Sequence, residues 1–195
     1  KEEFVLENQA LLPGFVNAHT HAAMSLFRGL ANDLPLMNWL NNYIWPAEKK
    51  WIDPEFVKDG SKLAIAEMLR GGTTCFNDMY FFSDSTAEVC INAGMRAVIG
   101  LIVIDLPTSW ASNSDEYLTK GESIHDSFKH NPLINTAFAP HAPYTVSNNS
   151  LERIAVLAEE LDIPIHMHIH ETDDEIKQSL KQYGKRPLKR LSELG

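Results

Sequence analysis

Residues 73–104 read TTCFNDMYFFSDSTAEVCINAGMRAVIGLIVI and predict a strand, a helix and a second strand in immediate succession. The strand-like run Thr73 to Asn77 comes first, a helical pattern spans Ser85 to Ala93, and Gly94 ends that helix. The run Arg96 to Ile104 is almost continuously apolar, which is typical of a strand buried on both faces of a parallel sheet. This segment therefore predicts a parallel β-α-β unit.

The same alternation extends outward in both directions. Further strands are predicted over Phe15 to Ala18, Leu133 to Ala139 and Ile163 to His168. Helical spacing or composition predicts the ranges Leu36 to Tyr43, Asp53 to Arg70, Ser114 to His130, Ser147 to Leu161, Asp173 to Tyr183 and Pro187 to Leu194. Asp53 and Ser114 are expected to be N-caps. The chain thus holds about five strand-then-helix units, the signature of a parallel α/β fold.

Polar residues sit at the carboxyl ends of the predicted strands: His19, Asp78, Asp105, His141 and His168. In a (β/α)8 TIM barrel this edge is the catalytic face, whereas a doubly wound sheet concentrates function at one switch point. No glycine-rich phosphate loop follows the first strand. A barrel is therefore favoured. Because a full barrel needs about 250 residues and eight units, we expect this chain to hold only the first ~5 units.

Composition excludes several classes of function. Of the 195 residues, 44% are hydrophobic and 22% are charged, and the formal net charge is -9 with both signs mixed along the chain. An acidic surface argues against nucleic acid and against a membrane as partners. No apolar run approaches the ~18 residues of a transmembrane helix. Cys75 and Cys90 lie in apolar segments and read as reduced thiols, so a cytoplasmic location is expected.

The segment Asn17-Ala18-His19-Thr20-His21 contains two histidines on one face of an extended chain. Such a pair converges on one ion, and histidine is the usual ligand of catalytic zinc. A hydrogen-bonded histidine pair at a strand end is an equally good interpretation of this motif taken alone.

The segment His166-Met167-His168-Ile169-His170-Glu171 places three more histidines at a spacing of two, which puts all three on one face of an extended strand. Clustered imidazoles need partners, so packing alone explains them poorly, although a histidine-rich surface strand remains the alternative. Neighbouring members lie about 6.5–7 Å apart, so only one or two can reach one metal, and the spacing leaves His166 and His168 open. Three nitrogen ligands leave a position for water, whose pKa a metal lowers towards ~7, and Glu171 is placed to shuttle its proton.

The segment Ala139-Pro140-His141-Ala142-Pro143-Tyr144 holds a histidine between two prolines. The prolines fix the backbone and present His141 from a strand end. A rigid loop with a locally bonded histidine is the competing interpretation.

Together these motifs resemble the metal-dependent amidohydrolase superfamily. The opening run Leu12 to His21 carries the first part of the likeness. The methylthioadenosine/S-adenosylhomocysteine deaminase and chlorohydrolase branch is indicated by the further motifs Met24 to Gly29, Trp45 to Glu48, Gly71 to Thr74, Asp78 to Tyr80, Ala139 to Tyr144 and His168 to Thr172. The likeness runs over nearly the whole chain.

The resemblance implies an organisation and a set of site residues. Residues 1–12 would end the N-terminal segment of a small flanking β-sandwich, and residues 13–195 would form the N-terminal portion of the barrel. One metal, zinc or in some relatives Fe2+, would be held by His19, His21 and His168, with an aspartate and a further histidine expected beyond residue 195. No lysine stands at His141, where two-metal relatives carry a bridging one, which implies a single-metal site.

Roles in substrate handling also follow from the resemblance. Glu171 would be the proton shuttle, Glu48 would hold ribose hydroxyls and His141 would contact the substrate; Trp45 and Trp110 are candidates for packing against base or thioether. The implied enzyme is a hydrolase of carbon–nitrogen bonds, a cyclic amidine deaminase. We expect it to convert 5'-methylthioadenosine or S-adenosylhomocysteine to inosine analogues and ammonia, as a homo-oligomer acting on a small molecule. Alternatives are a guanine or s-triazine deaminase or chlorohydrolase, and a non-catalytic barrel scaffold.

Overall fold

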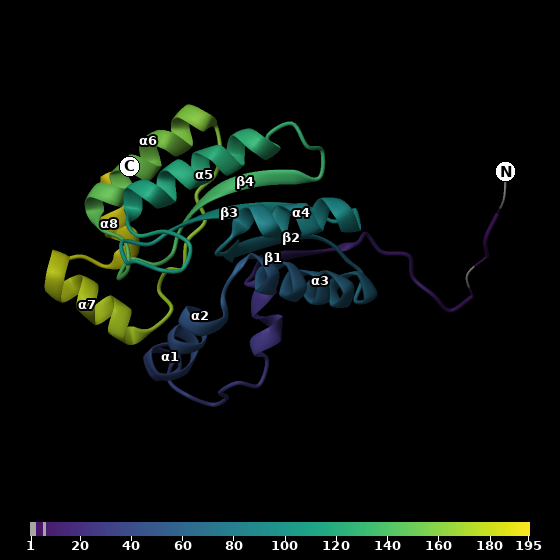
Figure 1. The fold of residues 1–195 in the computed structure, drawn as a ribbon, viewed down its shortest axis with the longest axis horizontal. Coiled ribbons are helices and arrows are strands. Elements are labelled where there is room, and N and C mark those ends of the chain that lie inside the picture. Colours follow the sequence, from purple (N-terminus) through teal and green to yellow (C-terminus); the bar gives the residue numbers. More distant parts are fainter. Residues whose placement is uncertain (1–2, 6) are drawn as a thin grey trace.

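The structure is a computed structural model that describes residues 3–5 and 7–195. Residues 1, 2 and 6, part of the predicted sandwich segment, lie outside the described residues. Among residues 3–5 and 7–14 no strand forms, and this segment runs away from the body of the molecule in Figure 1. Phe4 and Leu11 are 81% and 90% exposed. The assignment of residues 1–12 to a β-sandwich stays a prediction.

Four parallel strands form the sheet, and they pair in the order in which the chain makes them (Figure 1). The strands are β1 (Phe15–Thr20), β2 (Thr73–Tyr80), β3 (Arg96–Val103) and β4 (Ile134–Pro140). Consecutive order is that of a (β/α)8 barrel wall, whereas a doubly wound sheet reverses its order at a switch point. The predicted α/β barrel class is therefore confirmed. β3 is buried throughout from Ile99 to Val103, as its apolar sequence predicts.

Helices connect the strands, and several run alongside the sheet (Figure 1). The helical elements are η1 (Ala22–Phe27), α1 (Leu36–Trp39), η2 (Leu40–Ile44), α2 (Trp45–Trp51), α3 (Pro54–Arg70), α4 (Ser83–Ala93), α5 (Ser114–Phe128), α6 (Asn148–Leu161), α7 (Asp173–Tyr183) and α8 (Pro187–Leu194). α3 contacts β2, α4 and α5 contact β3, and α6 contacts β4. η1 follows β1 directly in the chain and packs against α3, so it lies next to the first strand of the sheet.

The helices begin where capping residues satisfy their free N–H groups. Asp53 accepts the N–H of Phe56 at 2.8 Å, as the sequence predicts. The cap of α5 is Asn113, which accepts the N–H of Glu116 at 3.0 Å, and not Ser114 as predicted. Asn113 has an extended backbone with φ -163°, while Ser114 is already the first helical residue, so only the former can cap.

The predicted fifth strand, 163–168, is only partly formed beside β4. Phe138 donates its N–H to Pro164 O at 3.0 Å and accepts the N–H of His166 at 2.8 Å, and there the regular ladder stops. The next donor in register would be Pro140, which has no N–H. His168 N–H instead bonds His141 O at 3.2 Å, one residue out of step. Pro140 therefore turns an expected strand into an extended segment held at two separate points.

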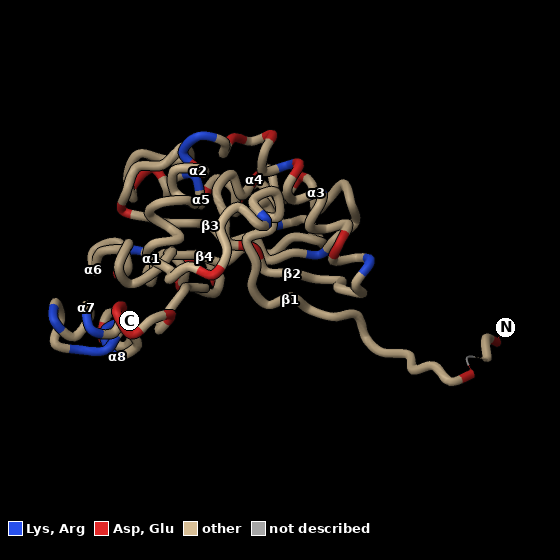
Figure 2. The backbone as a smooth tube through the Cα atoms, turned by 90° about the horizontal axis from the view of Figure 1, so that it is seen from below, with Lys and Arg blue, Asp and Glu red and all other residues tan. Residues whose placement is uncertain are grey.

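The sequence's other general features are visible in the structure. Cys75 and Cys90 are free thiols, half-buried and buried, and burial raises the pKa of Cys90 to about 12. Acidic and basic residues are interspersed along the described chain (Figure 2). Within residues 3–5 and 7–195, none of the helices has the length and apolar character needed to span a bilayer.

Candidate metal centre

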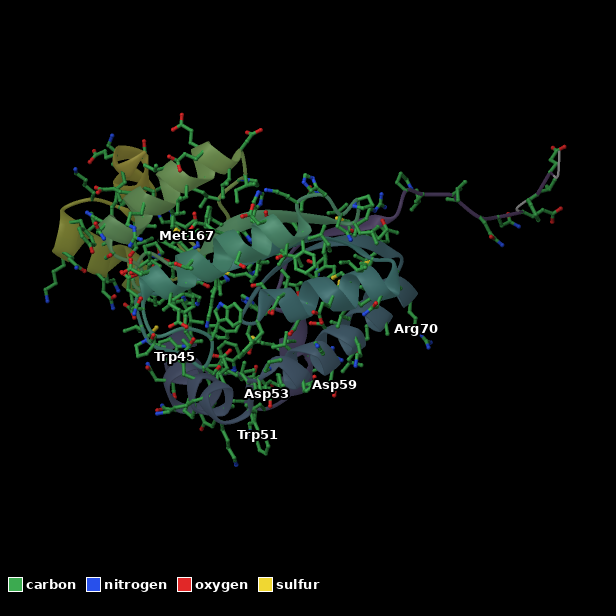
Figure 3. The ribbon with its side chains drawn as sticks, turned by 45° about the horizontal axis from the view of Figure 1, so that its top comes forward. Trp45, Trp51, Asp53, Asp59, Arg70 and Met167 are labelled. Carbon is green, nitrogen blue, oxygen red and sulfur yellow. The ribbon has the colours of Figure 1, made fainter. Side chains whose placement is uncertain are left out.

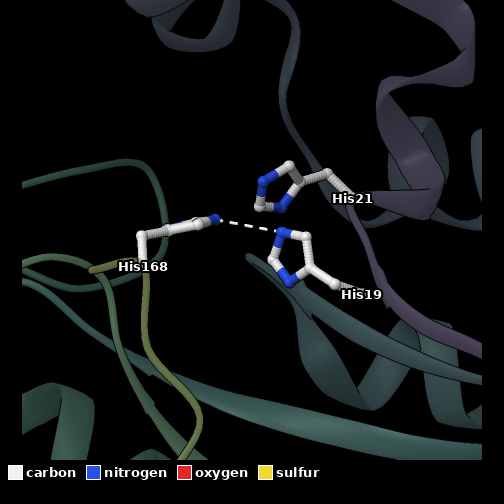
Figure 4. A group of neighbouring side chains, drawn as sticks. All are labelled: His19, His21 and His168. Atoms are coloured by element: carbon white, nitrogen blue, oxygen red, sulfur yellow. Dashed lines mark hydrogen bonds between the residues drawn. The ribbon is translucent and has the colours of Figure 1, made fainter. Parts of the chain in front are cut away.

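Three imidazoles meet at the carboxyl edge of the sheet. His19 is near the end of β1, His21 follows that strand directly, and His168 comes from the extended segment beyond β4. One nitrogen from each lies within 4.8 Å of the other two, and Nε2 of His19 is 3.1 Å from Nε2 of His168 (Figure 4). Segments about 150 residues apart in sequence are thus brought together, because β1 and the segment after β4 reach the same edge.

Backbone carbonyls orient two of these rings. Nδ1–H of His21 donates to Met79 O at 2.5 Å, and Nδ1–H of His168 donates to His141 O at 2.9 Å. A neutral imidazole that donates through Nδ1 carries its lone pair on Nε2, which is how metal-binding histidines are commonly fixed. Tetrahedral zinc with Zn–N of about 2.0–2.1 Å separates its nitrogen ligands by about 3.3 Å. The 3.1 Å between the His19 and His168 nitrogens is close to that separation, so the three residues fit a divalent metal.

The structure distinguishes the positions of His166, His168 and His170, which the spacing of the sequence could not do. His166 Nε2 lies 2.9 Å from His19 Nδ1, so His166 contacts the outer side of the His19 ring and is not a member of the three-histidine group. His170 turns away, because its backbone is left-handed with φ 58°, and its Nε2 accepts the N–H of Leu188 at 3.4 Å. The expectation that all three share one face is wrong for His170, since the chain there is not a regular strand.

Burial favours the neutral form of His19, His21 and His166. Desolvation lowers the pKa of His21 to about 4 and that of His166 to about 4, with neighbouring imidazoles adding to the effect. Burial followed by His168 also lowers the pKa of His19, which Glu171 partly offsets. Neutral imidazoles are the form that binds metals.

His141 is fixed by a separate hydrogen bond. The Thr145 hydroxyl donates to Ala142 O at 3.2 Å, so it accepts Nδ1–H of His141 at 2.9 Å. Burial, then the neighbouring histidines, lowers the pKa of His141 to about 3. His141 therefore presents Nε2 as a hydrogen-bond acceptor. The centroids of the His141 and His168 rings lie 5.2 Å apart.

Glu171 stands on a short connection between His168 and α7. Its Oε2 accepts the hydroxyl of Tyr144 at 3.1 Å. Its N–H donates to the carboxylate of Glu175 at 2.8 Å. The side chain is exposed on the same edge as the histidines, and its charge acts on His19.

A cleft of about 630 Å³ opens beside the histidines. His21 and His141 line one part of it, and Glu48 lines another. Apolar side chains make up much of the remaining wall: Met24, Trp39, Leu40, Ile44, Trp45, Phe81, Ile102, Ile104 and Leu106. Trp45, at the start of α2, is labelled in Figure 3. The cleft can therefore take a largely apolar molecule with a few polar groups.

Glu48 is paired inside this cleft. The hydroxyl of Tyr80, at the end of β2, donates to Glu48 Oε1 at 2.7 Å. Burial raises the pKa of Glu48 to about 7, and the bond from Tyr80 opposes that rise. A second carboxylate oxygen is left to accept hydrogen bonds from a ligand.

Trp110 does not share the position of Trp45. Its ring packs edge-on against Phe82 at 4.9 Å between centroids, with the Lys120 ammonium 4.6 Å above it. The Thr108 hydroxyl accepts the N–H of Trp110 at 3.1 Å, which folds the loop so that Thr108 and Ser109 line the cleft. Trp110 itself is not among the residues that line the cleft, and its contact with a substrate stays a prediction.

Sequence reasoning missed three residues that hold the site: Tyr80, Tyr144 and Glu175. Both tyrosines lie inside motifs that carry the family resemblance, without a role attached. Glu175 had a usable signal, because Thr172 and Glu175 have the spacing of a helix capping box.

Comparison with protein families matches residues 10–195 to the amidohydrolase family. The chain belongs to the amidohydrolase family. This agrees with the resemblance carried by the histidine motifs, and it accounts for a consecutive parallel sheet with histidines at its carboxyl edge.

Individual members of the family resemble the chain closely. It is 55% identical over 195 residues to the 5-methylthioadenosine/S-adenosylhomocysteine deaminase of Saccharophagus degradans, covering 100% of this chain and 44% of that protein. A crystal structure of an adenosine deaminase from Xanthomonas campestris with bound zinc matches with TM-score 0.92 and 57% identity, over 94% of this chain and 42% of the other. Guanine deaminase from C. acetobutylicum with bound guanine matches at TM-score 0.84 and 26% identity, over 94% and 46%. The chain thus spans less than half the length of these relatives.

Proposed function

We propose that the protein carrying this chain is a metal-dependent hydrolytic deaminase. Its proposed reaction converts 5'-methylthioadenosine or S-adenosylhomocysteine to the corresponding inosine compound and ammonia. The observation that carries the proposal is a single cleft whose wall includes His21 of the three-histidine group, the half-buried Glu48 and many apolar side chains. An adenine nucleoside with a thioether has matching parts: a base, two ribose hydroxyls and an apolar tail.

The roles of the residues follow from their positions. When bound, the metal supplies the Lewis acidity that activates water at His19, His21 and His168. Glu171 takes a proton from the attacking water and gives it to a ring nitrogen of the base. The remaining proton of the new C6 hydroxyl group then passes to the amino nitrogen, so that the C–N bond breaks, ammonia leaves and the C6 carbonyl forms. Glu48 accepts hydrogen bonds from the ribose hydroxyls, and Nε2 of His141 accepts one from the substrate.

The donor set supports zinc, since three neutral imidazoles suit this ion, and Fe2+ is the alternative. Trp45 is assigned to packing against the base or the thioether, because it lines the cleft. A homo-oligomer in the cytoplasm completes the proposal; the free thiols Cys75 and Cys90 are consistent with a reducing compartment.

The test assays the protein at its natural length on four substrates side by side: methylthioadenosine, S-adenosylhomocysteine, guanine and a chlorotriazine. Ammonia from the first two supports the proposal. Ammonia from guanine alone, or chloride from the triazine alone, replaces it with the corresponding relative's activity. If the protein is supplied with zinc but binds none and releases neither product, it is a scaffold.

The metal site is tested separately by measuring bound zinc in the His19→Ala variant and in His170→Ala as a matched control. We expect loss of zinc in the first and full occupancy in the second, because His170 points away from the group. Unchanged zinc in His19→Ala would rule out the assigned ligands.

A further inference from the structure

The start of α7 contains a carboxylate that reaches backward beyond its own helix. Thr172 is the N-cap and accepts the N–H of Glu175 at 3.2 Å. The side chain of Glu175 then passes the cap, and its two oxygens accept the N–H groups of His170 at 2.9 Å and Glu171 at 2.8 Å. Glu175 is only 4% exposed, although its neighbours Asp173 and Asp174 are exposed.

The backbone at this point is held in an unusual conformation. His170 has φ 58°, the left-handed region that residues other than glycine rarely adopt. Consecutive N–H groups in such a turn can point to the same side and form a concavity for an anion. The carboxylate of Glu175 occupies that position, so each of its oxygens pairs with one N–H of the turn. The left-handed turn and the buried carboxylate therefore support each other.

The residue fixed by this arrangement is Glu171. Its backbone N–H is bound by Glu175, and its carboxylate is bound by Tyr144 from the loop after β4. We infer that Glu175 is a positioning residue, which sets the place and direction of Glu171 by accepting the N–H groups of the two peptide bonds that flank the Cα of His170. The inference rests on the proposed proton-transfer role of Glu171, since its effect on the reaction passes through that side chain.

A purely structural cap predicts a different outcome from a positioning residue. A cap stabilises the helix, so its loss lowers the free energy of unfolding and leaves the chemistry of the folded enzyme unchanged. A positioning residue controls the geometry of proton transfer, and misplacement by about 1 Å can slow a reaction about 100-fold. The turnover number of the folded, metal-loaded enzyme therefore separates the two.

The test is the Glu175→Gln variant of the protein at its natural length. Glutamine has a single acceptor oxygen and places an NH2 group against the second N–H, so one of the two backbone bonds is lost. We expect kcat to fall about 10- to 100-fold while KM and bound zinc stay within about twofold of wild type. Amide hydrogen exchange at His170 and Glu171 should become faster.

The matched control is Asp174→Asn, which removes one negative charge from the same helical turn at an exposed position. It should leave kcat and the exchange rates at His170 and Glu171 unchanged. Unchanged kcat in Glu175→Gln, with only lower stability, would overturn the inference and leave a helix cap. If Glu175→Gln fails to fold, Glu175→Asp keeps the charge but withdraws the carboxylate, and it should show the same loss of kcat.

Failure of this inference is distinguishable from failure of the proposed function. If the wild-type protein deaminates none of the substrates, the proposed function fails, while the exchange rates still report whether Glu175 holds the turn. If the wild type is active and Glu175→Gln matches it in kcat, only the positioning role is lost.

Discussion

Gly60 lies where α3 crosses η1, and the Gly60→Ala substitution should disturb both folding and metal binding. A Cβ at this position would lie 2.8 Å from Ala23 Cα and 2.9 Å from the Ala23 carbonyl carbon, and closer still to the carbonyl oxygen. All three are backbone atoms, so no rotamer change relieves the overlap. Ala23 is completely buried and comes two residues after His21.

Two opposing effects decide the size of the change. Alanine in place of a glycine inside a helix gains about 1 kcal/mol from helix propensity. Carbon atoms in contact lie about 3.5–4.0 Å apart, so η1 and α3 must separate by nearly 1 Å to admit the methyl group. Overpacking of a close contact costs about 1–3 kcal/mol and exceeds the gain where only backbone can move. We expect a net loss of up to about 2 kcal/mol in the free energy of unfolding.

The same displacement should weaken metal binding, because η1 follows His21 directly and the N–H of Ala22 is tied to Asp78 at 2.7 Å. A shift of the His21 ring should lower zinc affinity about tenfold, because changes that disturb the orientation of metal ligands weaken metal binding by about 10- to 100-fold. Denaturant unfolding and chelator competition measure the two effects. The matched control is Gly121→Ala in α5, where an added Cβ meets Leu101 Cβ at 3.3 Å and the neighbour is a side chain. If Gly60→Ala proves as stable as wild type and binds zinc equally well, the packing argument is refuted.

Three further predictions follow from single contacts. His166→Ala should weaken zinc binding about 10- to 100-fold in a chelator competition, whereas His170→Ala should not, because only His166 contacts the ring of a proposed ligand; equal effects would contradict this. Burial raises the pKa of Glu48 to about 7, so the ionised carboxylate that accepts the ribose hydroxyls is depleted below that pH. KM for methylthioadenosine should therefore be about tenfold higher at pH 6 than at pH 8, and Glu48→Gln should remove this dependence. Asp53→Ala should cost about 1 kcal/mol in denaturant unfolding by removing the α3 cap, with kcat unchanged; no loss would show that the cap contributes nothing.

Much of the fold could be predicted because its determinants are local. The apolar run in β3, the aspartate cap and first-turn proline of α3 and the left-handed Gly94 after α4 each act within a few residues. Pro140 shows the limit of such reasoning. Its effect on the fifth strand depends on which residue lies opposite, and that register is set by the assembled sheet.

The candidate site likewise has one part that local spacing predicts and another that depends on the assembled structure. The H-x-H pair could be found from spacing, since both histidines lie on one segment. His168, and not His166, brings a nitrogen within 4.8 Å of both members of that pair, and this depends on how the segment after β4 lies against β1. The direction of Trp110 depends on a turn closed by the Thr108 hydroxyl, which the sequence does not reveal.

The consecutive order of the strands has a consequence for synthesis. Each strand pairs with the one made just before it, so the sheet can grow in step with the emerging chain and needs no distant partner. The three-histidine group cannot form in step with synthesis, because His168 is made 149 residues after His19. Until His168 is made, His19 and His21 lie at the carboxyl edge of the sheet without the third member of the group. Metal uptake by a nascent chain should therefore mark the moment when the last of these segments has docked, and a metal-sensitive probe on stalled chains of increasing length would time that event.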